Sequence, residues 1–331
     1  MANPFVAEIR RGPLVESRHR GSIAVVDTNG SIVLALGDID ALVYPRSAIK
    51  AMQALVLMEA GAAERFILSD EALALACASH GGEPGHVAVA EQMLAAAGLD
   101  ASALECGVHW PSHAPSAQAL ARSGHSATAL HNNCSGKHAG FILAARARGI
   151  DHRGYTNPEH PVQRAVKALL EHVTGAPIPD QYRAVDGCSV PTWAIPLKAL
   201  ARGFARLGSG KDLTPGRAKA AQRLRAACAA HPWHVAGTGR FCTAVMEHFG
   251  ARVFVKTGAE GVFCGAIPES GLGVAIKVDD GAARASEVAM AGVIERFVPL
   301  DDKDRAVLGR LLHPTLRNWN GVEVGAIAPA K

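Results

Sequence analysis

The chain has 331 residues, of which 49% are hydrophobic and 19% are charged, and its formal net charge at pH 7 is +4. This composition indicates an ordered globular protein, and the mild, scattered positive charge argues against a nucleic-acid-binding surface. The sequence has no run of 18 or more apolar residues and no charged-then-apolar leader at Met1. We therefore expect no membrane segment and a soluble, cytoplasmic protein.

Seven cysteines are dispersed along the chain, and none of them shows Cys-x-x-Cys spacing. An odd number cannot pair completely within one chain, so we predict neither a disulfide framework nor a zinc finger. Most of these thiols are expected to be small buried side chains in a reducing compartment.

Strand patterns come first in the chain. Two β-branched runs, 22–26 and 31–36, flank Asp27-Thr-Asn-Gly30, and Asn-Gly between such runs predicts a hairpin. A helix is predicted from about 47 to 59. The middle of the chain, from about 67 to 250, is predicted to be mostly helical. The amphipathic runs in it are 70–78, 85–97, 136–148, 161–173, 192–206 and 214–229.

Strand patterns return near the end of the chain. The runs 252–256, 262–266 and 273–278 are joined by glycine-rich turns and predict an antiparallel meander, and a last helix is predicted over 283–297. Strands therefore lie at both ends of the sequence, with helices between them. This order favours one antiparallel sheet built from both termini, with flanking helices and a large inserted helical region.

The predicted fold class is therefore α/β of the α+β type. We expect residues 1–331 to form a single catalytic unit. Its sheet region takes residues 1–60 plus 250–331, and its helical region takes residues 61–249.

One motif pairs a serine with a lysine. Ser47 precedes Lys50 by three residues, so on a helix the two side chains share a face, and the lysine can take the proton of the hydroxyl. This requires that burial or another cation lowers the pKa of the lysine. Ser-x-x-Lys followed by a later Lys-Thr-Gly, here at Lys256, is the order found in penicillin-binding proteins. The alternative for Ser47 is a helix N-cap.

A second serine lies in the segment Cys77-Ala-Ser-His-Gly-Gly82. The middle motif of penicillin-binding proteins is Ser-x-Asn, whereas here Gly81 stands two residues after Ser79. The amide is therefore replaced by a glycine-rich turn. The alternative is that Ser79 is a polar residue at a helix C-terminus before a glycine stop.

Two polar clusters carry thiols. Cys134 and Lys137 lie in the segment 131–138, and Asp186 and Cys188 lie in the turn 186–191. Two thiolates with nitrogen or oxygen ligands would suit zinc, although a lysine ligand must first lose its proton. The alternative is a set of buried cysteines beside helix starts.

These motifs together resemble the rhizobial-type, or class 3, L-asparaginases, and the resemblance spans roughly residues 5 to 320. It implies hydrolysis of L-asparagine to L-aspartate and ammonia by a homodimer whose fold is related to serine β-lactamases, penicillin-binding proteins and glutaminases. The segments that carry it are Tyr44-Pro-Arg-Ser-Ala-Ile-Lys50, Ala78-Ser-His-Gly-Gly82, Asn132-Asn-Cys-Ser-Gly-Lys-His138, Val185-Asp-Gly-Cys188, Ala236-Gly-Thr-Gly-Arg240 and Lys256-Thr-Gly-Ala-Glu-Gly261.

The resemblance also implies roles for single residues. It places two catalytic Ser–Lys pairs on Ser47 with Lys50 and on Ser79 with Lys256. It implies one zinc ion per subunit, structural or modulating, with the ligands Cys134, Lys137 and Cys188. It places Arg46, His138 and Asp186 around the same site as substrate-binding residues.

We expect Ser47 to attack the side-chain amide of L-asparagine with Lys50 as base, giving a β-aspartyl ester that water hydrolyses. Ser79 would relay a proton to the leaving ammonia or orient the substrate, Arg46 would bind the α-carboxylate, and Asp186 would bind the α-ammonium group. The alternative order of the two serines, with Ser79 attacking first, is equally compatible with the sequence. The alternatives are a glutaminase, a β-lactamase or D,D-peptidase, and a zinc- or amino-acid-binding protein without activity.

Overall fold

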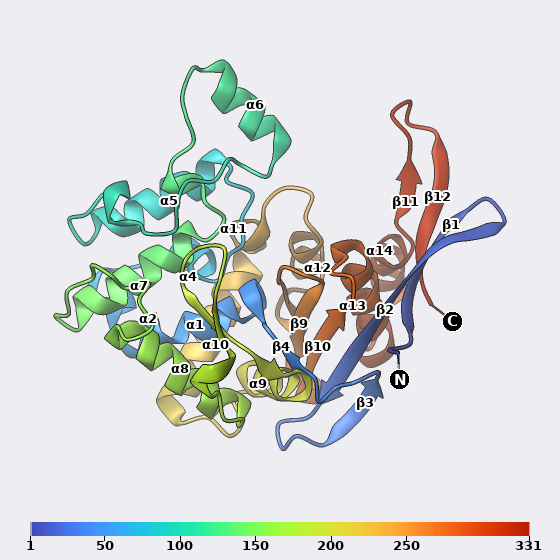
Figure 1. The fold of residues 1–331 in the computed structure, drawn as a ribbon, viewed down its shortest axis with the longest axis horizontal. Coiled ribbons are helices and arrows are strands. Elements are labelled where there is room, and N and C mark those ends of the chain that lie inside the picture. The colour runs from blue at the N-terminus through green and yellow to red at the C-terminus, as the bar shows by residue number, and fades with distance from the viewer. Residues whose placement is uncertain (1, 331) are drawn as a thin grey trace. The chain divides into compact units, whose positions relative to one another are not determined.

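A computed structural model describes residues 2–330. The chain separates into two compact units. The first, here called the sheet unit, takes the residues up to Ala48, then Ile195–Ser209, and the residues from His248 onward. The second, the helical unit, takes Ile49–Ala194 and Gly210–Glu247. Figure 1 shows the strands of both chain ends, blue and orange to red, in the sheet unit.

An antiparallel sheet of eight described strands forms the sheet unit, in the order β11-β12-β1-β2-β10-β9-β8, with β3 beside β2. Ala24 of β2 pairs with Ala275 of β10, so strands from the N-terminal and C-terminal parts of the chain are direct neighbours. This confirms the predicted antiparallel sheet built from both termini and its β8–β9–β10 meander. The strands are β1 Phe5–Arg11, β2 Leu14–Val26, β3 Ile32–Leu36, β8 Phe254–Thr257, β9 Val262–Ile267, β10 Leu272–Val278, β11 Thr315–Arg317 and β12 Glu323–Pro329.

Helices cover both faces of this sheet. Ala266 of β9 faces Gly208 of α9 (Leu197–Ser209), whereas its neighbour Gly265 faces Met290 of α13 (Ala283–Phe297). Because successive strand residues point to opposite faces, α9 and α13 lie on opposite sides of the sheet. Helix α13 has the predicted bounds, and α14 (Asp302–Leu312) packs against it. The sheet is therefore the middle layer of three.

The helix predicted over 192–206 begins later than expected. Residues Pro191–Trp193 form the strand β6, and Ile195–Pro196 form the two-residue strand β7, which pairs with β4 (Leu42–Val43). Because a residue before proline avoids the helical region, Pro196 delays the helix to Leu197.

The helical unit is built around α7, Ser135–Ala147, whose residues 135–145 are all buried. Helices α2, α3, α4, α5 and α8 pack around it. A short hairpin, β5 (Arg183–Val185) with β6, also belongs to this unit. The remaining helices are α1 Lys50–Gln53, α2 Leu55–Glu59, α3 Ala62–Arg65, α4 Asp70–Ala76, α5 Pro84–Ala95, α6 Ala114–Arg122, α8 Pro161–Thr174, α10 Pro215–Ala230, α11 Pro232–Ala236 and α12 Phe241–Phe249, of which α12 crosses the unit boundary.

The single helix predicted over 47–59 is wrong in detail, because the segment is divided into three pieces. A 3₁₀ turn, η1 (Arg46–Ile49), precedes α1, and Ala54 separates α1 from α2. Arg46 has a φ of +51°, in the left-handed region, so the chain enters this segment through a turn rather than a regular helical residue. Across residues 2–330, no helix has the length and apolarity needed to span a bilayer.

Candidate active site

A buried lysine and a serine are hydrogen-bonded within the helical unit. Lys50, the first residue of α1, has no solvent exposure, and Ser79 lies in the loop between α4 and α5. The Lys50 Nζ donates hydrogen bonds to Ser79 Oγ at 3.0 Å, to the Ala78 carbonyl at 2.5 Å and to the Asn133 carbonyl at 3.2 Å. These three acceptors match the donor capacity of a lysine side chain, so the geometry fixes Nζ against the serine hydroxyl.

The loop that carries Ser79 is fixed by its neighbour His80. Burial lowers the pKa of His80 well below its usual value, so the ring is neutral. Its Nδ1 accepts the Gly82 N–H at 3.1 Å, and its Nε2 lies 2.9 Å from Ser135 Oγ. Because Nδ1 is the acceptor, Nε2 carries the proton and donates to the serine. Ser79 itself follows α4 by three residues and is not its C-terminal residue.

Two cysteines and a second lysine lie beside this pair. Cys134 is the N-cap residue of α7, Lys137 lies in its first turn, and Cys188 lies in the β5–β6 turn. The Lys137 Nζ is 2.9 Å from Cys188 Sγ. A hydrogen bond from Cys188 lowers the pKa of the Cys134 thiol well below its usual value, despite burial, and the cations of Lys50 and Lys137 act in the same direction.

The donor set of Cys134, Lys137 and Cys188 suits a soft divalent metal ion. It offers two sulfurs and one nitrogen, all buried and converging on one another. Burial lowers the pKa of Lys137, but the sulfurs of Cys188 and Cys134 outweigh this and raise it, so a metal would have to displace the lysine proton. No group of three or more His, Cys, Asp or Glu side chains within residues 2–330 is arranged to hold a metal. The candidate set contains only two such side chains, because its third member is a lysine, and zinc stays a prediction.

His138 offers a buried donor next to the thiol cluster. Its Nδ1 lies 2.6 Å from the hydroxyl of Tyr155, which also accepts the Glu105 N–H. The Tyr155 hydroxyl therefore donates its proton to Nδ1, which leaves the proton of His138 on Nε2. In the described part of the chain, this Nε2 is buried and has no hydrogen-bond partner. A buried N–H without an acceptor is costly, so the position favours a bound polar group.

Asp186 lies at the edge of the same cluster. It starts the β5–β6 turn, and its Oδ1 accepts the Gly187 N–H at 2.8 Å. After larger effects from burial and from the two cysteines, its charge contributes to raising the pKa of Lys137. The helical unit thus holds seven of the predicted site residues, Lys50, Ser79, Cys134, Lys137, His138, Asp186 and Cys188.

The sheet unit holds the other predicted residues. Arg46 and Ser47 lie in η1, and Lys256 is a buried residue of β8 whose Nζ donates to the Thr257 carbonyl at 2.8 Å. A Cβ on Gly258 would lie 2.9 Å from the Pro45 carbonyl oxygen, so only glycine lets the strand end approach this turn. The Lys-Thr-Gly motif therefore packs against the turn that carries Ser47.

The predicted pairing of Ser79 with Lys256 joins residues of the two units and stays a prediction, as does the pairing of Ser47 with Lys50. The hydrogen bond that the structure records is a different one, between Lys50 and Ser79. Sequence reasoning did not identify this contact, because it spans 29 residues and depends on how α1 packs against the loop after α4.

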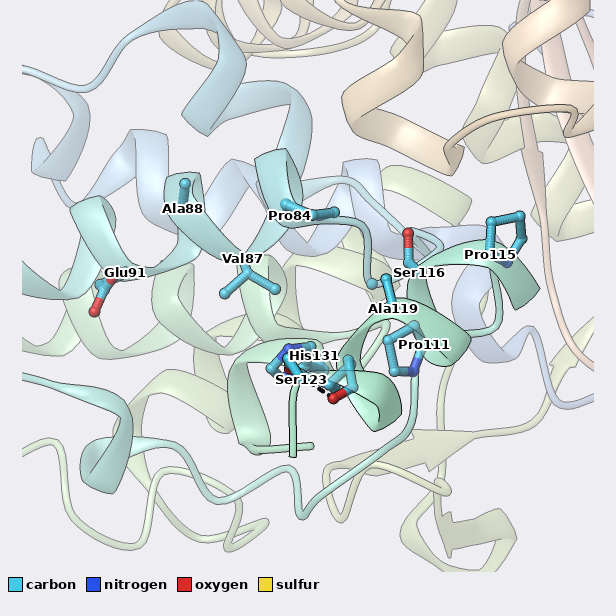
Figure 2. Close-up of a pocket in the computed structure, with 12 residues that line it drawn as sticks. Pro84, Val87, Ala88, Glu91, Pro111, Pro115, Ser116, Ala119, Ser123 and His131 are labelled. Carbon is cyan, nitrogen blue, oxygen red and sulfur yellow. Dashed lines mark hydrogen bonds between the residues drawn. The ribbon is translucent and has the colours of Figure 1, made fainter. Parts of the chain in front are cut away.

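A cavity of about 670 Å³ lies elsewhere in the helical unit, between α5 and α6. Figure 2 shows Pro84, Val87 and Glu91 of α5 on one side of it and Ala119 of α6 on another. Its lining is mainly apolar, and none of the predicted site residues belongs to it. The cavity is therefore not the predicted amidohydrolase site.

Comparison with known proteins identifies the family. The model of the L-asparaginase II family matches residues 7–329, which is nearly the entire sequence. The chain belongs to the L-asparaginase II family. The sequence-based assignment to an asparaginase family is thereby confirmed, and the protein is an asparaginase-type amidohydrolase. No curated protein matches the sequence significantly.

Solved structures with distant similarity include two described as β-lactamases. One, from Mycobacterium bovis, is 15% identical, with a TM-score of 0.38 over 84% of this chain and 95% of that chain. Another, a putative β-lactamase from Bacteroides dorei DSM 17855, is 16% identical, with a TM-score of 0.42 over 83% and 92%. Mglu in its glutamate form is 15% identical, with a TM-score of 0.39 over 91% of this chain and 67% of that chain.

Proposed function

We propose that this L-asparaginase II family member hydrolyses L-asparagine to L-aspartate and ammonia through a serine nucleophile. The observation that carries the proposal is the buried hydrogen bond between Lys50 Nζ and Ser79 Oγ, at 3.0 Å, in a chain of this family. A lysine bonded to a serine hydroxyl is an arrangement suited to moving a proton during acyl transfer.

In the proposed reaction, the Ser47 oxygen bonds to the side-chain amide carbon and its proton passes to Lys50. The carbon–nitrogen bond then breaks, and the leaving nitrogen takes a proton to depart as ammonia. As Lys50 takes the Ser47 proton, it passes one of its own through the bonded hydroxyl of Ser79 to the amide nitrogen, so the leaving ammonia receives the proton that the serine loses. Water then attacks the β-aspartyl ester and releases L-aspartate. Lys256 would form the second Ser–Lys pair with Ser79 and add its positive charge to the site.

Three side chains would bind the charged and polar ends of the substrate. Arg46 would hold the α-carboxylate and Asp186 the α-ammonium group, because each charged group then forms hydrogen bonds to a side chain of opposite charge. The unpartnered Nε2–H of His138 would donate to a substrate oxygen. This assignment gives a role to a buried donor that no other described group satisfies.

Cys134, Lys137 and Cys188 are proposed to hold one zinc ion per subunit. When bound, zinc would supply Lewis acidity and fix the segments that carry the three ligands. The chain's own contribution there is positional, because Cys134 starts the helix that carries His138, and Cys188 lies two residues after Asp186. We further propose that the protein acts as a homodimer in the cytoplasm.

Ammonia release tests the proposal directly. The purified protein is assayed with L-asparagine, L-glutamine and nitrocefin, with and without added zinc, and a Lys50→Met variant serves as the control. We expect steady ammonia release from L-asparagine at the highest kcat/KM, and its loss in the variant. Preferential release from L-glutamine would make the protein a glutaminase, and nitrocefin turnover alone would make it a β-lactamase. No turnover of any substrate would overturn the proposal.

A further inference from the structure

A buried carboxylate lies four residues after Ser79 and takes no part in the proposed chemistry. Glu83 is only 6% exposed and is the N-cap residue of α5. Its Oε1 accepts the backbone N–H of Thr238 at 2.8 Å, and its Oε2 accepts the Thr238 hydroxyl at 2.7 Å. Burial alone would raise the pKa of Glu83, but these two bonds outweigh it and keep the group ionised. One carboxylate thus ties the Ser79 loop to a segment more than 150 residues away in the chain.

The same distant segment also binds Ser79 directly. The carbonyl of Val235 accepts the Ser79 N–H at 2.9 Å. The backbone of Ser79 is therefore bonded to one point of the segment 233–238, and Glu83 is bonded to another point three residues further on. The segment acts as a brace across the loop that presents the serine.

A third connection holds the other end of the brace. The ring of His86 stacks on Trp233, with centroids 4.0 Å apart, and its Nε2 lies 3.0 Å from the Trp233 carbonyl. The Nδ1 of His86 accepts the Glu83 N–H at 3.2 Å. The Trp233 indole N–H in turn donates to the Thr238 hydroxyl at 2.9 Å. The polar side chains of Glu83, His86, Trp233 and Thr238 thus all have hydrogen-bond partners, which favours a single arrangement of the loop.

Close backbone packing supports the same conclusion. Gly237 has a φ of +104°, and a Cβ there would lie 2.6 Å from the Glu83 Oε1 and 3.2 Å from the Gly81 N. The brace therefore lies directly against both the carboxylate and the loop, and only glycine permits this approach.

We propose that Glu83 is a positioning residue, which sets the Ser79 hydroxyl against Lys50 by clamping the Ser79 loop to the segment 233–238. The inference rests on the proposed function, since it assigns Ser79 and Lys50 to the reaction. The loop between α4 and α5 has no regular secondary structure of its own, so its shape depends on such external bonds. A displacement of about 1 Å in a catalytic group costs on the order of 100-fold in rate.

The test compares variants that remove or keep the clamp. Glu83→Gln replaces the charged acceptor, Thr238→Val removes the hydroxyl donor, and Thr238→Ser keeps it. Asp304→Asn is the matched control, because Asp304 is also a buried carboxylate that accepts several hydrogen bonds, but it belongs to the sheet unit. For each protein, kcat and KM for L-asparagine and the melting temperature are measured, and crystal structures give the Lys50 Nζ–Ser79 Oγ distance.

We expect Glu83→Gln and Thr238→Val to lower kcat by about 10- to 100-fold while KM changes by less than about threefold. Thr238→Ser should stay within about threefold of wild type, because it restores the same bond. Asp304→Asn should lower the melting temperature and leave kcat unchanged. In Glu83→Gln the Lys50–Ser79 distance should exceed 3.5 Å, against 3.0 Å in the native protein.

Unchanged kcat in both clamp variants, or a loss of kcat in Asp304→Asn that matches theirs, would overturn the positioning role. If Glu83→Gln does not fold, Thr238→Val decides. If the wild-type protein releases no ammonia, the proposed function fails, and the crystallographic distance alone decides the inference. An unchanged distance then contradicts the inference, and a lengthened one supports it.

Discussion

The two units bury polar groups in different ways. In the sheet unit, the buried carboxylate of Asp304 is matched by its neighbours, because it accepts from Arg252 at 2.7 and 2.9 Å and from His248 at 2.8 Å. In the helical unit, Lys50, Cys134, Lys137 and His138 are buried together, and the Nε2 of His138 has no partner among the described atoms. The hydrogen-bonding groups of Asp304 and its neighbours are satisfied within the protein, whereas a cluster with an unused donor is suited to binding another molecule.

The two units also differ in how many ionisable groups they bury. The sheet unit is mainly a packed scaffold that presents Ser47 and Lys256, and the helical unit concentrates ionisable groups whose pKa values are strongly shifted. Buried charges are costly, so a cluster of them is retained where it serves binding or catalysis.

The largest expected effect comes from the sheet unit. Ser47→Ala should lower kcat for ammonia release by about 10⁴-fold or more, because it removes the proposed nucleophile. Ser79→Ala should cost less, about 10²- to 10³-fold, because it removes a proton relay. Rapid quenching followed by intact-protein mass spectrometry should detect the aspartyl ester in the Ser79→Ala variant and not in the Ser47→Ala variant. An adduct that still forms in Ser47→Ala would contradict the assignment.

A second prediction asks whether the sheet unit contributes a cation to the chemistry. Lys256→Met should lower kcat by about 10²-fold, since the positive charge that we propose for the second Ser–Lys pair is lost. Lys277→Met is a matched control, because Lys277 is also a strand lysine of this unit whose Nζ donates to the carbonyl of the next residue. The control should retain wild-type kcat. Equal losses in both variants would indicate a general effect on the sheet.

A third prediction tests whether the two cysteines of the helical unit bind zinc. Cys134→Ser and Cys188→Ser should lower bound zinc, measured by atomic emission, from about one ion per subunit to near zero, and lower kcat by about 10-fold. Cys228→Ser is the control, because Cys228 is buried in α10 and has no proposed metal role. Wild-type protein that binds no zinc after incubation with the metal would contradict the proposed ligands.

The smallest expected effect is a pH-dependent change in the free energy of unfolding, caused by His86 in the helical unit. Burial lowers the pKa of His86 from 6.5 to about 4, so the folded state disfavours the protonated ring. Between about pH 6.5 and pH 4, His86 binds a proton in the unfolded chain but not in the folded protein. The free energy of unfolding therefore decreases as the pH falls through this range. Between pH 7 and pH 5 the loss is about 2 kcal/mol in the free energy of unfolding.

Urea titration at both pH values measures this loss. His86→Gln should show a smaller difference between pH 7 and pH 5 than wild type, because glutamine does not titrate. An equal difference in the two proteins would show that His86 does not carry the effect.

Much of the sheet unit was predictable from local sequence. The β-branched runs around Gly30 and the meander before Val278 carry strong strand patterns, and α13 has its predicted bounds. The strands β1 and β12 were not predicted. Their pairing joins residues about 320 positions apart, and β12 contains glycine and proline, which weaken a local strand pattern.

The candidate site was predictable as a set of residues but not as a set of contacts. Motif spacing identified Lys50 and Ser79, yet their hydrogen bond depends on long-range packing. Glu83 had one local signal, because it precedes Pro84 at the start of a helix. Its link to Thr238 has no local signature, since the two residues are 155 positions apart. Local patterns indicate elements and motifs, whereas side-chain pairing follows from tertiary structure.

We propose that the Lys50–Ser79 cluster of the helical unit serves the hydrolysis of L-asparagine. The most direct measurement is steady-state ammonia release by wild type and Lys50→Met, with folding of the variant checked by circular dichroism. We predict continuous release by wild type and a loss of about 10³-fold or more in the variant. A folded Lys50→Met protein that retains more than about a tenth of wild-type kcat would contradict the claim.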